Sequence, residues 1–88
     1  MYSFYCIISE VENTYFVDFP DFKGSKCSCF TFGETLTEAV EMAEDVLYTC
    51  LDLLIDEKRD IPTPSLLKDI LKLADEGNSI MKISVKVQ

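Results

Sequence analysis

Residues 19–39 read FPDFKGSKCSCFTFGETLTEA, and this stretch decides the fold. It predicts, in turn, the end of a strand, a loop, another strand, a glycine turn and the start of a helix. Thr35 and Glu38 have the spacing of a capping box, in which the Thr hydroxyl accepts from the Glu38 amide and the Glu carboxylate returns to the cap amide. Gly33 supplies the tight or left-handed turn that leads from strand to helix.

The helix that begins here is expected to span residues 36–58, about 35 Å at the standard rise. Apolar residues at 3.6-residue spacing predict its core-facing stripe: Leu36, Ala39, Val40, Ala43, Val46, Leu47, Cys50, Leu51 and Leu54. Acids line the opposite side, with Tyr48 at their margin: Glu38, Glu41, Asp45, Asp52 and Asp56. Pro62 and Pro64 prevent any continuation. Ser65 is then expected to cap a short second helix with Leu66, Ile70 and Leu73 on its apolar side.

Four segments have the alternation and composition of strands. They are residues 2–9, residues 14–19, residues 26–32 and residues 81–87. In the third, Ser28, Phe30 and Phe32 face one side, and Cys27, Cys29 and Thr31 face the other. Short loops make the first three an antiparallel meander, and the long helical connection predicts a last strand parallel to its neighbour. The expected fold is therefore α+β with the order βββααβ, a four-stranded mixed sheet carrying one long helix on one face.

These segments resemble the HicB-type antitoxin family, including its stand-alone members. Phe19-Pro20-Asp21 with Gly24 is similar to the family's FPDLPG loop, and residues 31–39 (TFGETLTEA) to its T-x-G-D-T-x-E-E-A helix entry. Ala43 and Leu47 occupy the positions of Ala and Leu in the ENAxEAL motif that continues the family's helix. Residues 61–65 (IPTPS) match the IPxPS motif that follows it. Residues 25–28 look like a short insertion, and Met42 replaces an Asn. The motif positions taken as structural are Phe19, Pro20, Asp21, Gly24, Gly33, Thr35, Glu38, Ala39, Pro62, Pro64 and Ser65.

The resemblance implies a partial ribonuclease H-like (HicB-like) fold with sheet order 3-2-1-4. It also implies that residues 1–88 form a single HicB-like domain without the DNA-binding domain that commonly follows it in the family. A chain of 88 residues fits one small domain. Its 48% hydrophobic content suffices for a core and leaves apolar surface that favours self-association as a homodimer or tetramer. The exposed residues expected to drive that association are Tyr5, Ile7 and Phe16.

Charge and cysteine usage narrow the function further. The net charge of −8 disfavours direct binding to nucleic acid and favours a basic protein partner. No apolar run predicts a membrane span or a signal peptide, so a cytoplasmic location with four reduced cysteines is expected. The strand placement of Cys27 and Cys29 and the core character of Cys6 and Cys50 favour small apolar fillers over a zinc site, leaving a redox role as the alternative.

Catalysis is not expected from this chain. Two-metal nuclease chemistry needs carboxylates that converge on one point, and neither the first nor the last strand supplies them. The sequence contains no histidine, and no cofactor or metal site is predicted. Asp18 and Asp21 could form at best a single pair of carboxylates near one loop.

The resemblance implies an antitoxin that binds and occludes a small basic HicA-type mRNA interferase. The candidate contact residues are Asp21, Phe22, Glu41, Asp45, Tyr48 and Asp52. For each helix acid the alternative is a merely solvated face, and for Phe19 and Phe22 it is a role as core anchors. A stand-alone structural or regulatory homo-oligomer without a toxin is the alternative function.

Overall fold

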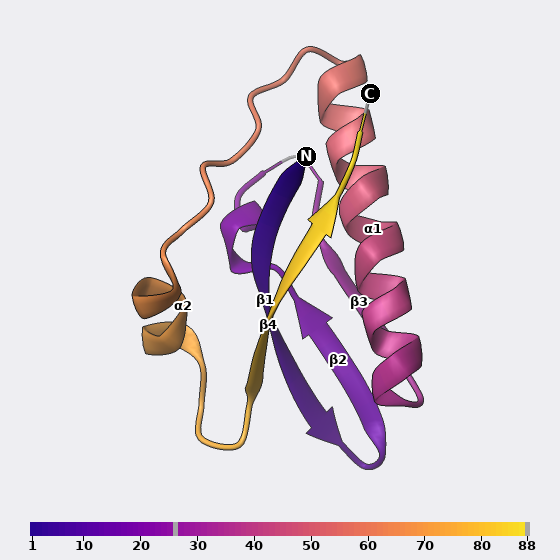
Figure 1. Cartoon of the computed structure of the whole chain (residues 1–88), viewed down its shortest axis with the longest axis vertical. Coiled ribbons are helices and arrows are strands. Elements are labelled where there is room, and N and C mark those ends of the chain that lie inside the picture. The colour runs from indigo at the N-terminus through magenta and orange to yellow at the C-terminus, as the bar shows by residue number, and fades with distance from the viewer. Residues whose placement is uncertain (26, 88) are drawn as a thin grey trace.

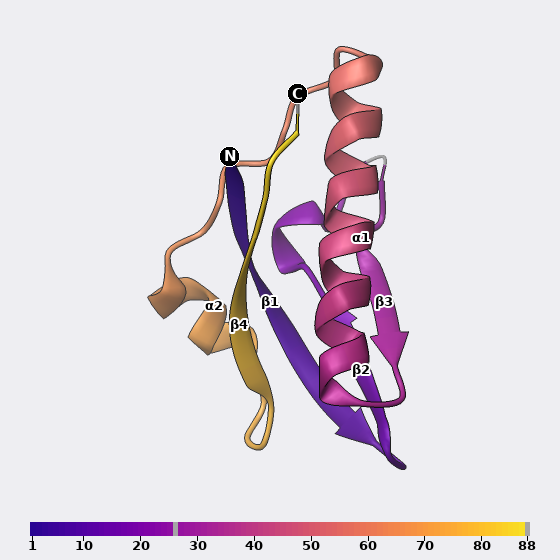
Figure 2. The same ribbon diagram turned by 45° about the vertical axis from the view of Figure 1, so that its right-hand side comes forward.

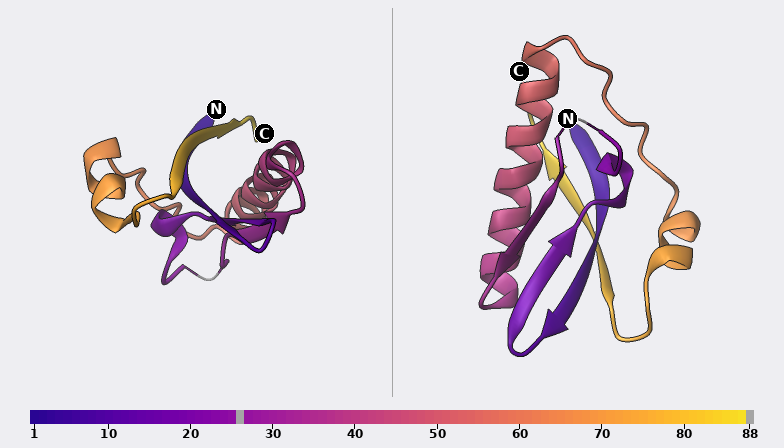
Figure 3. Two further views of the ribbon diagram at one scale, coloured as in Figure 1. Left: turned by 90° about the horizontal axis from the view of Figure 1, so that it is seen from below. Right: turned by 180° about the vertical axis from the view of Figure 1, so that it is seen from behind.

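The computed structural model describes residues 1–25 and 27–87. The four strands form one sheet in the order β3-β2-β1-β4, as expected. Helix α1 lies inside the curve of this sheet, whereas α2 lies outside it (Figure 1; Figure 3). In chain order the elements are β1 (Tyr2–Val11), β2 (Thr14–Asp18), the 3-10 helix η1 (Pro20–Phe22), β3 (Phe30–Gly33), α1 (Leu36–Asp56), α2 (Leu67–Leu73) and β4 (Ser79–Val85).

The direction of β4 corrects the predicted mixed sheet. β4 pairs with β1 antiparallel, with Tyr2 opposite Val85 and Ile8 opposite Ser79, so the whole sheet is antiparallel. The crossover rule assumes one traverse of the sheet between two strands. Here α1 runs along the sheet in one direction, and residues 57–66 with α2 run back along it on the outer side (Figure 2). β4 therefore starts from the end opposite to the one that a single crossover would reach.

The entry into α1 confirms the predicted cap and refines it. The Thr35 hydroxyl accepts from the Glu38 amide at 3.0 Å, whereas the Glu38 carboxylate accepts from the Glu34 amide rather than from Thr35. Gly33 is required for space and not for a left-handed backbone. A Cβ on Gly33 would lie 2.5 Å from the Ala39 nitrogen, so only glycine lets the helix start so close to β3.

The core lies between α1 and the concave face of the sheet. The buried face of α1 is confirmed by Ala39, Ala43, Leu47, Cys50, Leu51 and Leu54, although Leu36 is 46% exposed. Val17 and Ile83 meet this helix from the sheet, and Phe4 packs edge-on against Phe22 with ring centroids 4.8 Å apart.

Other elements also differ from expectation, and β4 (Ser79–Val85) begins two residues before the expected segment 81–87. β3 is shorter than residues 26–32 and includes Gly33; Lys26, the expected first residue, lies outside the described part of the chain. Its facing is nevertheless confirmed, because Cys29 and Thr31 are buried while Phe30 and Phe32 are exposed. The second helix is capped by Leu66 without a side-chain bond, and only Ile70 of its apolar residues is buried.

A candidate protein-interaction surface

The outer face of α1 carries negative charges only. The helix sequence LTEAVEMAEDVLYTCLDLLID contains acids but no lysine or arginine. Glu41, Asp45, Tyr48 and Asp52 follow one another at spacings of three or four residues, which places them on a single stripe. All four are exposed, and together we call them the acidic stripe.

The carboxylates of the acidic stripe have no internal partner in the described part of the chain. Among the described residues, ion pairs join Arg59 to Glu57 and Lys72 to Asp69, and neither involves this stripe. The helix dipole adds negative potential at the C-terminal end of α1, where the last turn carries no basic residue. The stripe is thus an unneutralised negative surface, suited to a cationic partner.

Apolar side chains interrupt this charge. Tyr48 is 45% exposed between Asp45 and Asp52, and Met42 and Leu53 are also exposed on α1. Aromatic residues surrounded by charge are typical anchors of protein interfaces, because they bury a large area at small cost in side-chain entropy. The exposed ring of Tyr48 among acids thus has the features of such an anchor.

Of the two roles considered for the loop around η1, partner contact and core anchoring, the structure gives Phe22 the second. Phe22 is 1% exposed and packs edge-on against Phe19 as well as Phe4, so its side chain belongs to the core. Pro20 starts η1, and Gly24 adopts φ +86° just after it. This is the core-anchor alternative: the ring of Phe22 is not presented to a partner.

Asp21 closes the loop onto a distant segment. One carboxylate oxygen accepts from the Ser65 amide at 2.8 Å, and the other accepts from the Ser65 hydroxyl. Ser65 therefore does not cap α2 but fastens the stretch containing Pro62 and Pro64 to η1. The two sequence motifs FPDF and IPTPS thus form one clamp, which reasoning from local patterns missed because its halves are 44 residues apart.

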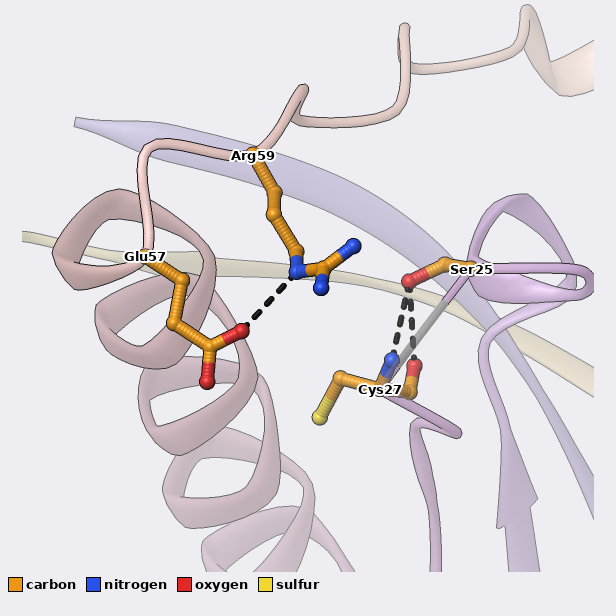
Figure 4. Close-up of polar contacts among 4 residues, drawn as sticks. All are labelled: Ser25, Cys27, Glu57 and Arg59. Carbon is orange, nitrogen blue, oxygen red and sulfur yellow. Dashed lines mark hydrogen bonds and ion pairs between the residues drawn. The ribbon is translucent and has the colours of Figure 1, made fainter.

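The cysteines also differ from expectation, since they are not all reduced. Cys27 and Cys50 form a disulfide with their Cα atoms 5.7 Å apart, joining the loop before β3 to the middle of α1. The Ser25 hydroxyl and the backbone of Cys27 hydrogen-bond to each other, and the Glu57–Arg59 ion pair lies between that turn and the end of α1 (Figure 4). Cys27 was expected to be a small apolar core residue. It instead bonds covalently to α1, because the inner face of that helix lies against this loop.

The remaining thiols, Cys6 and Cys29, are buried in the core. Burial raises the pKa of Cys6 from 9.0 to about 11 and that of Cys29 to about 12, and the negative charge of Asp18 adds to both shifts. Both thiols thus stay protonated at neutral pH. A reactive cysteine needs the opposite shift, so these two side chains are structural.

Pockets and metal-holding clusters are both absent from the described part of the chain. Residues 1–25 and 27–87 enclose no pocket, and no three of their Cys, Asp or Glu side chains gather closely enough to hold a metal ion. Within the same residues, neither helix has the length and apolar content needed to cross a lipid bilayer. What the geometry offers is a charged surface for another macromolecule.

Comparisons with known proteins identify the family of this chain. Residues 1–85 match the model of a family described as the HicB-like antitoxin of bacterial toxin–antitoxin systems. Over 54 residues the chain is 41% identical to Antitoxin HicB 2 of Photorhabdus laumondii subsp. laumondii. That match covers 61% of this chain but only 36% of the relative, so the chain spans about a third of the relative's length.

Solved structures show the same fold. The N-terminal domain of Burkholderia pseudomallei antitoxin HicB aligns with a TM-score of 0.77 at 20% identity, over 98% of this chain and 100% of that one. A chain in a toxin–antitoxin complex from Streptococcus pneumoniae aligns with a TM-score of 0.73 at 25% identity, over 93% of this chain and 67% of that one.

Proposed function

This chain belongs to the HicB-like antitoxin family of bacterial toxin–antitoxin systems, and we propose that it binds and covers a small basic HicA-type mRNA interferase. The observation that carries this proposal is the acidic stripe, whose carboxylates lack an internal counter-charge among the described residues. A toxin that binds RNA must present a basic surface to phosphates. The stripe complements that surface in charge and competes with RNA for it.

Inhibition of this kind requires no chemistry from the chain itself. Covering the toxin's RNA-facing surface excludes the substrate, and opposite charges accelerate the encounter of the two proteins. We therefore propose a non-enzymatic role in the cytoplasm, without cofactor. Residues 1–88 are expected not to bind operator DNA, because a net charge of −8 repels the phosphate backbone.

The structure also refines which residues we propose as contacts. Glu41, Asp45, Tyr48 and Asp52 are exposed and remain the proposed contact set. Asp21 and Phe22 would act indirectly, because the first is bonded to Ser65 and the second is buried. Their role in the proposal is to hold η1 and the following loop in place.

A second candidate is a stand-alone structural or regulatory homo-oligomer. It is favoured by the exposure of Phe30 and Phe32 on the outer face of the sheet. Tyr5, Ile7 and Phe16 were expected to be the wet residues of this face, but all three are half-buried. The two candidates use different surfaces, so the chain could associate with itself and still offer the acidic stripe to a toxin.

The proposed function is tested with a small basic protein, if the reading frame next to that of this chain encodes one. Purified toxin is mixed with labelled RNA and increasing amounts of the chain, and RNA cleavage is followed. We expect cleavage to stop at a stoichiometric ratio, with inhibition that weakens as salt rises. Undiminished cleavage at a large excess of the chain, or a neighbouring frame that encodes no such protein, would favour the homo-oligomer instead.

A further inference from the structure

The two edges of the sheet are protected to different degrees. Exposed sheet edges invite pairing with other strands, and proteins usually guard them with charged side chains, lysine above all. β4 forms one edge and carries the exposed Lys82, with Lys86 just beyond it. β3 forms the other edge, and its exposed side chains are Phe30 and Phe32, at 50% and 55% exposure. The β3 edge therefore has no charged side chain that would oppose pairing with another strand.

The backbone of this edge is also oriented for pairing. Phe19 donates to the carbonyl oxygen of Cys29 at 3.1 Å, so Cys29 directs its polar groups toward β2. In an antiparallel pair this orientation alternates along the strand. Thr31 and Gly33 therefore also point toward β2, whereas Phe30 and Phe32 direct their N–H and C=O groups outward. Among the described residues, no backbone or side-chain hydrogen bond from outside the sheet reaches either of them.

The aromatic side chains form a row that ends at the same edge. Phe16 on β2 lies opposite Phe32, and its ring is 6.1 Å from that of Phe30 and 6.2 Å from that of Phe32, centroid to centroid. The row lies on the outer face, on the side of the sheet away from α1. Aromatic side chains on a strand stabilise a sheet most when other aromatic or β-branched side chains lie directly opposite them on the next strand.

We propose that β3 pairs antiparallel with β3 of a second copy of the chain, about a two-fold axis at Thr31. This register places Phe30 opposite Phe32 of the second copy, and each such pair exchanges both of its N–H···O bonds. It also extends the aromatic row across the axis. The inference rests on the self-association named above and assigns its surface.

A second copy fits this edge better than a strand of other composition, for two reasons. Phe30 and Phe32 lie on either side of Thr31, so a two-fold rotation at Thr31 places each of them opposite the other in the second copy. The edge is therefore complementary to itself. The edge also carries no charged side chain between Phe30 and Gly33, which lets two chains of net charge −8 approach there. In the joined sheet both α1 helices lie on the same side, so their acids repel. Pairing is therefore expected to strengthen with salt, opposite to toxin binding.

The experiment uses the whole chain in sedimentation and in amide exchange followed by NMR. Small interfaces are weak, so we expect a monomer–dimer equilibrium with dimer populated at roughly 100 µM and favoured by added salt. The amides of Phe30 and Phe32 are expected to exchange fast in dilute samples and at least tenfold more slowly in concentrated ones. Thr31, already bonded within the sheet, should change little.

Phe32→Glu is expected to weaken dimerisation at least tenfold by placing like charges across the axis. Ser79→Glu is the matched control, because it adds the same charge at an exposed site on β4. A dimer that ignores Phe32→Glu, or that leaves the Phe30 and Phe32 amides unprotected, would overturn the β3 assignment while preserving self-association. A monomer at roughly 500 µM in high salt would overturn both. Neither outcome affects inhibition of the toxin, whereas loss of inhibition in Phe32→Glu would assign this edge to the toxin instead.

Discussion

The η1 loop and the outer face of α1 both present acids, yet those acids have different surroundings. The Asp21 carboxylate uses both oxygens on Ser65, inside the molecule. The acidic stripe of Glu41, Asp45, Tyr48 and Asp52 has no such partner in the described part of the chain. A carboxylate that is bonded internally contributes to stability, whereas an unneutralised one on the surface contributes to recognition. The two regions should therefore separate stability from binding when they are mutated.

The largest expected effect tests the two-sidedness of α1. Leu47 is 0% exposed and Tyr48 is 45% exposed, although they are neighbours in the sequence. Leu47→Asp buries an unpaired charge in the core and should cost more than about 4 kcal/mol, enough to unfold the domain. Tyr48→Asp should change the free energy of unfolding by less than about 0.5 kcal/mol. Urea unfolding of both variants checks this, and similar midpoints would mean that the facing of α1 is wrong.

The next effect concerns how the loop before β3 is held. Reducing the Cys27–Cys50 disulfide opens a loop with a sequence separation of 23 residues. Loop-closure entropy predicts a loss of about 3 kcal/mol in the free energy of unfolding. Thermal melts with and without dithiothreitol measure this loss. Cys27→Ser serves as the control, because it should start from the lower stability and show no response to the reductant.

The Asp21–Ser65 clamp should follow in size. Asp21→Ala removes two hydrogen bonds to a charged acceptor and leaves the Ser65 amide without its partner, at a cost of about 2 kcal/mol. Asp21→Asn retains one acceptor oxygen and should lose about half as much. Affinity for the toxin, measured below the melting temperature, should stay within about twofold of the parent. A stable Asp21→Ala variant that fails to bind would place Asp21 in the interface after all.

The effect that is smallest at neutral pH comes from the buried thiols, and it grows only as the pH rises above about 9. The folded state holds the protons of Cys6 and Cys29 up to pKa values of about 11 and about 12, whereas an unfolded thiol releases its proton near 9.0. The unfolded state therefore binds fewer protons above pH 9, and stability falls as pH rises, by up to about 1.4 kcal/mol per pH unit for each thiol. Denaturant titrations from pH 8 to 11 should show a shallower decline when both cysteines are replaced by alanine. Equal slopes would contradict the assigned pKa shifts.

The features that residue patterns alone predicted correctly are local ones, whereas the strand order β3-β2-β1-β4 was expected from the family resemblance. Alternation in residues 2–9 and the Thr35–Glu38 spacing depend on neighbours within a few residues, so the first strand and the start of α1 appear where expected. The acidic stripe follows from the same periodicity, because a charge opposite a buried stripe must face outward.

The features that the sequence did not reveal depend on the path of the chain in space. The direction of β4 follows from the return run through residues 57–66, and nothing in the local pattern of that segment shows on which side of the sheet it passes. The Cys27–Cys50 and Asp21–Ser65 contacts join residues 23 and 44 positions apart. Alternation placed Phe30 and Phe32 on one face, but the outward direction of their backbone groups requires the register with β2.

The acidic stripe is tested most directly by the kinetics of toxin binding to a chain in which Glu41, Asp45 and Asp52 are all changed to Lys. These residues are exposed, so the melting temperature should stay nearly unchanged. Stopped-flow association at low salt should slow at least tenfold, inhibition of RNA cleavage should be relieved, and the difference in rate should shrink at ~0.5 M salt, where screening removes the attraction. A triple variant that binds and inhibits the toxin as fast and as tightly as the parent would contradict the assignment of this face to the toxin.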